Sequence, residues 1–195
     1  MATESDQLTQ AMRSLEAAFL IGVEGVCEIW LCRHADCYQD PDYDVNDPAL
    51  SRLGREQAAR LAERVRRAKP AAVYASPYRR APETARAING DVRVDPRLIE
   101  MQLEMRLDGS MELKEEPAAV IARMRAALAD IAREHAGERV VVISHGAAII
   151  ATLTDILMLE PGQLRLLPYF TSVSVLRVLG DRAMAGGLTD TSHLE

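Results

Sequence analysis

Cysteine, aromatic residues and excess positive charge are all scarce in this chain of 195 residues. Its three cysteines, Cys27, Cys32 and Cys37, form neither an even disulfide set nor a zinc-binding spacing, so we expect reduced thiols in or near a buried strand and a reducing, cytoplasmic setting. Lys and Arg number 23 against 29 Asp and Glu, and the resulting net charge of −6 argues against general binding of nucleic acid or an anionic membrane surface. An aromatic content of 4% gives little sign of a pocket that stacks nucleobases.

A signal peptide and a membrane span are not expected either. Residues 1–10 are polar and acidic, and the most apolar stretch, residues 140–159, is interrupted by Ser144, His145 and Asp155. A buried strand followed by a buried helix fits that stretch better than a span. With 48% hydrophobic and 27% charged residues, the composition is that of one globular domain.

Helical and strand patterns alternate along the chain, which predicts an α/β fold: a three-layer α/β/α sandwich with a mainly parallel sheet. Apolar residues at helical spacing predict helices over residues 5–20, 51–69, 81–89, 117–135 and 146–157. Apolar, β-branched runs predict strands over residues 26–32, 71–75, 92–95, 139–144, 173–179 and 182–188. Two other segments lack a clean period: residues 36–47, an expected loop, and residues 97–116, an expected lid-like or cleft-lining insertion.

Residues 1–25 are expected to form a helical extension in front of a single domain over residues 26–195. Apolar side chains recur along this extension at helical spacing: Leu8, Met12, Leu15 and Phe19. We expect this apolar face to be buried, either on the domain's own sheet edge or against a partner subunit, which leaves a homodimer open.

Histidine and arginine side chains follow three of the predicted strands. Arg33 and His34 follow the first strand, Arg80 lies just beyond the second, and His145 with Gly146 follows the strand that ends at residue 144. Binding sites of open parallel sheets form beyond the carboxyl ends of the strands. We therefore expect a site at this edge of the sheet.

These residue types suit phosphoryl transfer. Arginine holds phosphate oxygens through bidentate, charge-assisted hydrogen bonds, and a neutral imidazole can attack phosphorus to form a covalent intermediate. The N–H groups of the helix that Gly146 opens favour an anion. A carboxylic acid is needed in addition to protonate the leaving oxygen.

Five motifs then carry a resemblance: Arg33-His34; Leu50-Ser51-x-x-Gly54-x-x-Gln57-Ala58; Ser76-Pro77-Tyr78-Arg79-Arg80-Ala81-x-x-Thr84-Ala85; Arg97-Leu98-x-Glu100; and Val141-Val142-Ile143-Ser144-His145-Gly146. In order and spacing they resemble the motifs of the histidine phosphatase superfamily, the phosphoglycerate mutase-like proteins. The resemblance covers roughly residues 31–152 and implies a phosphoglycerate mutase-like fold.

The resemblance also implies a role for each residue at the strand ends. His34 would be the nucleophile that becomes phosphohistidine, and Glu100 would be the proton donor. His145 would complete the phosphate pocket and stabilise the transition state. The phosphoryl group would be held by Arg33, Arg80 and Gly146. No metal ion and no other cofactor would be required.

The sequence departs from the family pattern at three places. Ala35 replaces the usual glycine after the first histidine, and Cys37 replaces a hydroxyl residue that would hydrogen-bond phosphate or substrate. The segment after Glu100 does not match cleanly, so Asp36 and Glu104 stay open as alternative acids.

The leading interpretation is a metal-independent phosphomonoester hydrolase that acts on a small phosphorylated substrate through His34. A phosphoglycerate mutase-type phosphotransferase is less favoured, because the insertion after Glu100 is short. A phosphate-binding regulatory protein on a decayed phosphatase scaffold is motivated by Cys37. A serine hydrolase at Ser144 fits worst, because Val142 stands where its motif needs glycine.

Overall fold

The computed structural model describes residues 4–195 except 39–43, 45–46 and 107. Most of the loop expected over residues 36–47 therefore lies outside the described residues. In the described part, helices and strands alternate as expected, and each expected boundary is met to within a few residues. The helices are α1 (Glu4–Ala18), α2 (Arg52–Ala68), α3 (Arg80–Ile88), α4 (Pro117–Glu134) and α5 (Gly146–Ile156), with 3₁₀ turns at Pro96–Leu98 and Ser192–Leu194.

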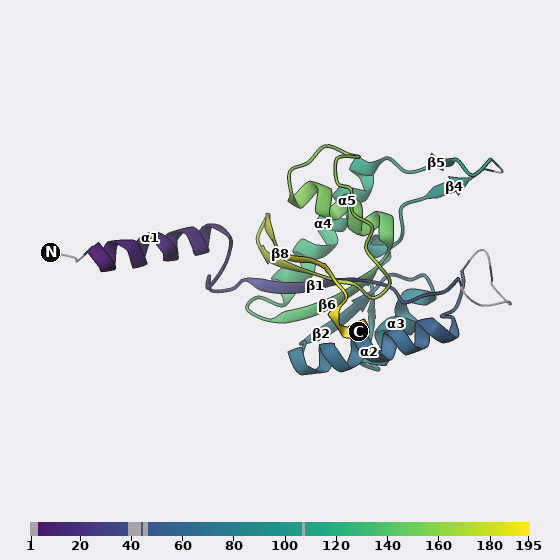
Figure 1. Cartoon of the computed structure of the whole chain (residues 1–195), viewed down its shortest axis with the longest axis horizontal. Coiled ribbons are helices and arrows are strands. Elements are labelled where there is room, and N and C mark those ends of the chain that lie inside the picture. The colour runs from purple at the N-terminus through teal and green to yellow at the C-terminus, as the bar shows by residue number, and fades with distance from the viewer. Residues whose placement is uncertain (1–3, 39–43, 45–46, 107) are drawn as a thin grey trace.

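A mixed, mainly parallel sheet forms the centre of the molecule (Figure 1). Its strands are β1 (Cys27–Arg33), β2 (Ala72–Ala75), β3 (Arg93–Val94), β6 (Arg139–Ser144), β7 (Val173–Leu179) and β8 (Arg182–Asp190). The spatial order is β3-β2-β6-β1-β7-β8. The first four strands in that order run parallel, whereas β7 is antiparallel to β1 and β8 is antiparallel to β7. β1, the first strand in sequence, thus pairs with strands from far along the chain.

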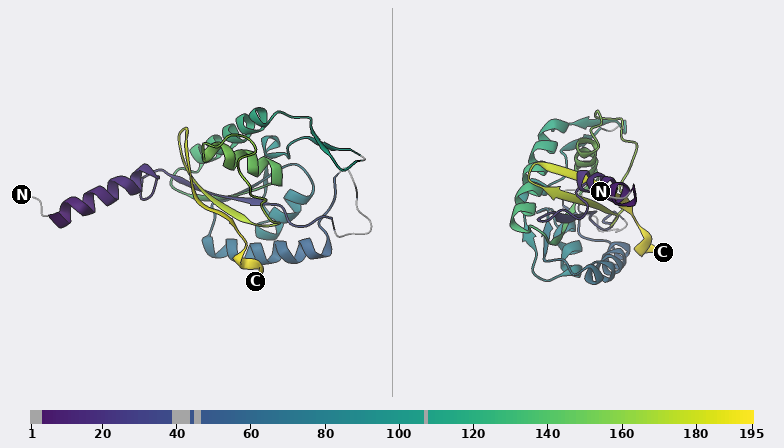
Figure 2. Two further views of the ribbon diagram at one scale, coloured as in Figure 1. Left: turned by 45° about the horizontal axis from the view of Figure 1, so that its top comes forward. Right: turned by 90° about the vertical axis from the view of Figure 1, so that its left-hand side faces the viewer.

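Helices cover both faces of this sheet, which confirms the three-layer sandwich (Figure 2). On one face, α4 and α5 pack over buried side chains that include Ile29, Leu31, Val140, Val142 and Leu176. On the other face, α2 and α3 pack over a second set that includes Cys32, Val73, Val141, Ile143 and Val173. Adjacent residues of one strand point to opposite faces, so the almost wholly apolar runs in β1 and β6 supply both layers.

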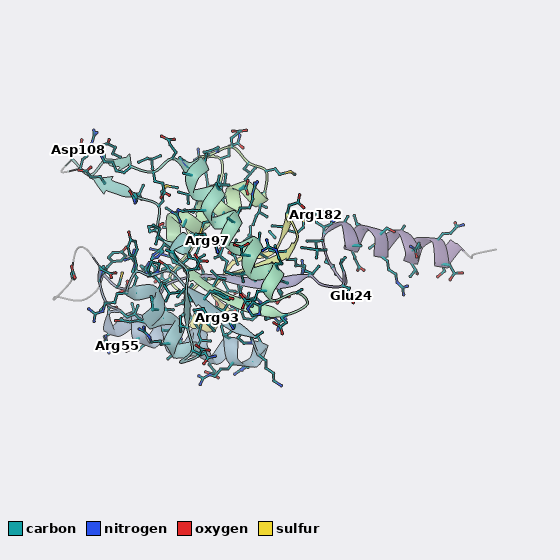
Figure 3. The ribbon with its side chains drawn as sticks, turned by 180° about the vertical axis from the view of Figure 1, so that it is seen from behind. Glu24, Arg55, Arg93, Arg97, Asp108 and Arg182 are labelled. Carbon is teal, nitrogen blue, oxygen red and sulfur yellow. The ribbon has the colours of Figure 1, made fainter. Side chains whose placement is uncertain are left out.

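The segment from 97 to 116 contains a small hairpin. Strands β4 (Leu103–Met105) and β5 (Met111–Leu113) pair in antiparallel fashion, apart from the central sheet. The hairpin projects from the domain at the end opposite α1, and Asp108 lies near its tip (Figures 1 and 3). The segment without a clean period is therefore a projecting hairpin, and its expected part as a lid or cleft lining stays a prediction.

The N-terminal helix α1 stands away from the rest of the molecule (Figures 1 and 2). Residues 5–18 are all exposed, and Leu8, Met12 and Leu15 on its apolar face are exposed by 66%, 50% and 54%. Of the two covers considered, the domain's own sheet edge is therefore not the one that this chain uses, and a partner subunit stays open. The helix extends along the direction of β1, beyond the reach of the sheet's own apolar side chains.

None of the described helices combines the length and the apolar character that crossing a membrane requires.

Candidate active site

The strand register places His34 beside His145. Arg33 of β1 is paired with Ser144 of β6, so the next residue on each strand emerges at the same edge of the sheet. The His34 N–H donates to the Ser144 carbonyl at 2.9 Å, and the two imidazole rings lie 5.1 Å apart, centroid to centroid. Both histidines are buried, with 1% and 0% of their surfaces exposed.

Hydrogen bonds define the protonation state of His34. Its Nδ1 lies 2.8 Å from the Ala35 carbonyl, which can only accept, so Nδ1 carries the proton. Its Nε2 accepts from Arg80 Nε at 3.2 Å, so Nε2 carries the lone pair. Burial, and then the charges of Arg80 and Arg33, hold the pKa of His34 well below its usual value. At neutral pH His34 is therefore an uncharged imidazole whose Nε2 is unprotonated.

Arg80 is the first residue of α3 and is 8% exposed. Thr84, one turn further along, ties this helix to the segment that carries His34. Its hydroxyl donates to the Arg80 carbonyl at 2.7 Å and accepts from the Ala35 N–H at 3.0 Å. One threonine thus fixes the distance between the arginine and the histidine that it contacts.

Arg33 lies between the loop before β7 and the start of α5. Its Cζ lies 4.1 Å from the centre of the Phe170 ring, and Nη1 donates to the Pro168 carbonyl at 2.8 Å. A Cβ added to Gly146 would lie 3.5 Å from Cζ and Nε of Arg33, which places this guanidinium against the first residue of α5. Burial lowers the pKa of Arg33 from its ordinary value, but a guanidinium stays charged in water-exposed and buried sites alike.

His145 precedes α5 and faces β2. Its Nε2 lies 2.7 Å from Ser76 Oγ, and burial together with the neighbouring cations lowers its pKa well below the usual value. Among the described residues, two buried side-chain nitrogen atoms have no hydrogen-bond partner, His145 Nδ1 and Arg33 Nε. Both belong to this site, and both suit an oxygen-rich anion at the positive end of α5.

Glu100 lies at that same helix end. Its Oε1 accepts from the N–H groups of Ala148 and Met101 at 2.9 and 2.8 Å, and its Oε2 accepts from Ala147 at 3.3 Å. The carboxylate thus takes up N–H groups of the first turn of α5, where a phosphate would also be favoured.

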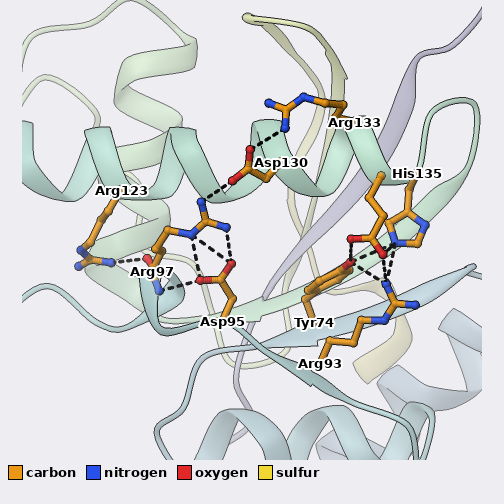
Figure 4. Close-up of polar contacts among 9 residues, drawn as sticks. Tyr74, Arg93, Asp95, Arg97, Arg123, Asp130, Arg133 and His135 are labelled. Atoms are coloured by element: carbon orange, nitrogen blue, oxygen red, sulfur yellow. Dashed lines mark hydrogen bonds and ion pairs between the residues drawn. The ribbon is translucent and has the colours of Figure 1, made fainter.

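A polar network holds the segment that leads to Glu100, and Figure 4 shows the part of this network around Arg97 and Arg123. Arg123 of α4 donates to the carbonyls of Arg97 and Ile99, both at 2.8 Å. The Arg97 side chain in turn bridges Asp95, at 2.7 Å, and Asp130 of α4, at 2.6 Å. The position of Glu100 is therefore set by α4 as well as by α5.

The two alternative acids have other partners. Asp36 is 3% exposed and accepts from Ser51 Oγ at 2.6 Å, which ties it to the start of α2. Glu104 lies on β4 and pairs with Lys114 at 2.8 Å across the hairpin base. Of the three carboxylates considered, Glu100 is the one with its oxygens at the start of α5.

Gly54 allows α2 to pack closely against the segment that follows His34, here called the catalytic loop because it follows the candidate nucleophile. A Cβ at this position would fall 1.9 Å from the Asp36 carbonyl oxygen. The close approach allows Ser51 N–H to donate to that carbonyl at 3.0 Å and Gln57 Oε1 to accept from the Asp36 N–H at 2.9 Å. The motif around Gly54 therefore docks the segment that follows His34, and it does so without touching His34.

Several residues of the site could not be found from the sequence. Thr171, in the left-handed region at φ 59°, donates its N–H to the Arg33 carbonyl at 3.1 Å. His193 Nε2 lies 3.1 Å from the Thr171 hydroxyl, and Arg64 Nη1 lies 3.3 Å from His193 Nδ1. Burial and the Arg64 charge lower the pKa of His193 to about 4, so it is neutral at pH 7. The C-terminal segment thereby braces the loop that carries Phe170.

Four of the chain's eight aromatic residues gather around the two histidines. The Phe170 ring lies 5.7 Å from His34, and the Tyr78 ring lies 5.4 Å from His145. Tyr38 and Tyr169 both contact Phe170, at 5.9 and 5.7 Å. Although aromatic residues are few in the chain, half of them therefore lie at this edge of the sheet.

The six residues expected to form the site thus meet at the carboxyl edge of the parallel strands. Within the described ranges, no cluster of three or more His, Cys, Asp or Glu side chains could hold a metal ion.

Comparison with known proteins gives consistent matches. A family model described as histidine phosphatase superfamily (branch 1) matches residues 29–114 and 103–191. A metal-independent phosphoserine phosphatase of Arabidopsis thaliana is 29% identical over 203 residues, covering 87% of this chain and 84% of that protein. A probable phosphoglycerate mutase GpmB of Enterobacter sp. (strain 638) is 28% identical over 160 residues, covering 67% and 74%. The solved structure of Bacillus stearothermophilus YhfR has a TM-score of 0.74 at 23% identity, covering 87% of this chain and 100% of that chain.

Proposed function

Because this chain belongs to the histidine phosphatase superfamily (branch 1), we propose that it is a metal-independent phosphomonoesterase that forms a phosphohistidine on His34. The protonation state of His34 carries the proposal. Its proton sits on Nδ1, and its Nε2 lone pair is directed at Arg80, beside the cations that would hold a phosphoryl group. A nucleophile has to be unprotonated at the attacking atom, and this one is so at neutral pH.

The first step transfers the phosphoryl group to the enzyme. Arg33, Arg80 and the N-terminus of α5 bind the phosphoryl oxygens and offset the charge that spreads over them in the transition state. Nε2 of His34 forms a bond to phosphorus while the bond from phosphorus to the ester oxygen breaks. A proton passes from Glu100 to that leaving oxygen, so the product departs as an alcohol.

In the second step water attacks the phosphohistidine and phosphate leaves. Glu100, now ionised, accepts a proton from the water, and the N–P bond returns its electron pair to His34 Nε2. His145 lies beside the reacting nitrogen and contributes a hydrogen bond to the phosphoryl oxygens through Nδ1, which requires that its proton reside there.

Glu100 lies where an arriving phosphate would bind. N–H groups of α5 hold its oxygens, and a phosphate would take the same groups. An arriving phosphate would therefore compete with Glu100 for these donors, which places the carboxyl group beside the bound ester.

The substrate class is a small phosphate monoester. The similarity to a phosphoserine phosphatase supports hydrolysis over transfer to a second alcohol, as does the small size of the insertion at residues 97–116.

The test is hydrolysis of an aryl phosphate in the presence of a metal chelator. We expect turnover by the wild type and none by His34→Ala, whereas His135→Gln, at the end of α4 away from the site, should retain activity. An alkaline quench, which preserves phosphohistidine, should trap phosphate on His34. Phosphate transfer to an added alcohol in place of water would instead identify a phosphotransferase. Phosphate binding without turnover on any monoester would identify a regulatory phosphate-binding protein.

A further inference from the structure

The apolar face of α1 has no cover within its own chain. Residues 5–18 are all exposed, and four large apolar side chains follow one another at spacings of four, three and four residues: Leu8, Met12, Leu15 and Phe19. An isolated helix of this length is marginal in water. Its stability therefore depends on a surface that covers this stripe.

The helix cannot turn back onto its own domain without unwinding at its base. Leu20, two residues after the helix, is 1% exposed and adopts φ 58°, a left-handed conformation that ends the helix. Arg182 of β8 donates to the Ala18 carbonyl at 2.8 Å and anchors the last turn (Figure 3). These contacts direct α1 away from the molecule.

An apolar groove lies at the same end of the domain. It runs between α4 and the turn that joins β7 to β8, with a volume of about 290 Å³ in its main part. The groove continues along α4 past Ala129 toward Arg133, beside Val178 and Gly180. Six of its lining residues are apolar and alternate with charged ones: Ile121, Leu128, Ala129, Ile156, Val178 and Met184.

The groove and the stripe match in length. From Ile121 to Arg133 the face of α4 spans about 18 Å, and from Leu8 to Phe19 the stripe of α1 spans about 17 Å, both at 1.5 Å per residue. Met158 on the groove rim is 92% exposed, and methionine adapts its shape to an incoming surface.

Charge favours the same pairing. Residues 4–18 carry three carboxylates and one arginine, a formal charge of −2. The groove is lined by three arginines and two aspartates, a formal charge of +1. Arg125 pairs with Asp155 and Arg133 pairs with Asp130, so the charge of the groove is small. A membrane surface rich in anionic lipid would repel α1, whereas this groove would not.

We propose that the chain forms a two-fold symmetric dimer in which α1 of each copy docks in the groove between α4 and the β7–β8 turn of the other. One helix face is small beside the roughly 1,200–2,000 Å² that a specific interface buries, so two reciprocal contacts are needed. A two-fold axis supplies both at once. Since the groove lies next to the base of α1, a partner helix that runs antiparallel to α1 reaches it.

The test begins with the mass of the full chain in solution, by light scattering and by sedimentation, at concentrations up to about 100 µM. We expect a dimer for the wild type and a monomer for Leu15→Asp, which places a charge in the stripe. Ser14→Asp, on the exposed polar side of the same helix, should remain dimeric. A wild type that stays monomeric throughout this range would overturn the proposal.

The groove is tested separately. Ala129→Glu fills it with a charge and should yield a monomer, whereas Ala126→Glu, on an exposed position of the same helix, should not. A dimer that survives Ala129→Glu would show that α1 docks elsewhere. Hydrolysis of the aryl phosphate should persist in both variants, so this outcome is independent of the proposed catalysis.

Cross-linking distinguishes docking in the groove from pairing of the two α1 helices. Oxidation of a mixture of Leu15→Cys and Ala129→Cys chains should give a disulfide-linked heterodimer, and neither variant alone should cross-link efficiently. The three native cysteines are buried and do not compete. Cross-linking of Leu15→Cys with itself, as the main product, would contradict the proposal and indicate helix pairing.

Discussion

The Nε atom of Arg80 lies 3.2 Å from Nε2 of His34, so the guanidinium contacts the very nitrogen that would attack phosphorus. The contact has two consequences. A fixed positive charge beside Nε2 opposes its protonation, and the same charge lies where the equatorial oxygens of a bound phosphoryl group would be. In the proposed mechanism, one side chain would thus keep the nucleophile unprotonated and bind the phosphoryl group that it attacks.

Loss of Arg80 should therefore impair catalysis more than binding of the leaving group. We expect Arg80→Ala to lower kcat/KM by about 10²–10³-fold, the usual effect of removing one donor to a developing charge. Arg80→Lys should restore little, because an ammonium lacks the planar fork of a guanidinium. Arg79→Ala is the matched control, since Arg79 is exposed and pairs with Glu83. Equal losses at Arg79 and Arg80 would refute the assigned role.

The proton donor can be identified by its dependence on the leaving group. Glu100→Gln keeps an amide oxygen for the N–H groups of Ala148 and Met101 but has no proton to donate. We expect a loss of about 10²–10⁴-fold with an alkyl phosphate and a much smaller loss with 4-nitrophenyl phosphate, whose leaving oxygen needs no proton. Glu104→Gln should have no effect on either substrate. A uniform loss across leaving groups would show that Glu100 only caps α5.

The buried histidines make folding stability sensitive to acid. The pKa values of His34 and His145 are lower in the folded protein than in the unfolded chain, so below about pH 6.5 the unfolded chain binds protons that the folded protein does not. Each histidine then lowers the free energy of unfolding by about 1.4 kcal/mol per pH unit, and contributes nothing above that pH.

Between pH 7 and pH 5 we therefore expect the free energy of unfolding to fall, with both histidines contributing to the loss. Urea denaturation at the two pH values measures this loss, and His34→Gln should lose less stability than the wild type. An identical pH dependence for the two proteins would mean that His34 titrates normally. The activity should resist mild acid for the same reason: kcat/KM at pH 6 should stay close to its value at pH 7, because Nε2 of His34 stays unprotonated.

Gly54 should tolerate no larger residue. A Cβ at this position would overlap the Asp36 carbonyl, which is backbone and cannot rotate away, so Gly54→Ala should either separate α2 from the catalytic loop or destabilise the fold by about 3 kcal/mol or more. Gly90→Ala, where a Cβ has open space, is the control and should change stability by less than about 1 kcal/mol. Urea denaturation of the two variants measures the difference. Equal midpoints for Gly54→Ala and Gly90→Ala would contradict the close approach of Gly54 to the Asp36 carbonyl.

Much of the fold was predictable because its strands are strongly apolar and its helices carry clear signals. Ser51 caps α2 through the Gly54 N–H at 3.0 Å, and the runs at residues 27–33 and 139–144 form adjacent central strands. The site was predictable for a related reason. Residues that follow parallel strands share one edge of the sheet, so the pairing of Arg33 with Ser144 brings the two histidines together.

The remaining features depend on contacts that no local pattern encodes. Phe170 comes from an irregular segment between α5 and β7, and its place over Arg33 rests on Thr171, a β-branched residue with positive φ. The surroundings of the apolar face of α1 could not be predicted either, because periodicity shows that a face is apolar but not what covers it.

The position of β1 in the middle of the sheet also determines how the molecule can fold. The strand over residues 27–33 pairs only with strands at 139–144 and 173–179, which lie more than a hundred residues later in the chain. Such distant pairing gives the fold a high contact order. Folding is slow because the entropy of closing the long loops is lost before the strand pairs form. His34 and His145 meet only when β1 joins β6, so refolding should restore catalytic activity in the same late step that completes the sheet.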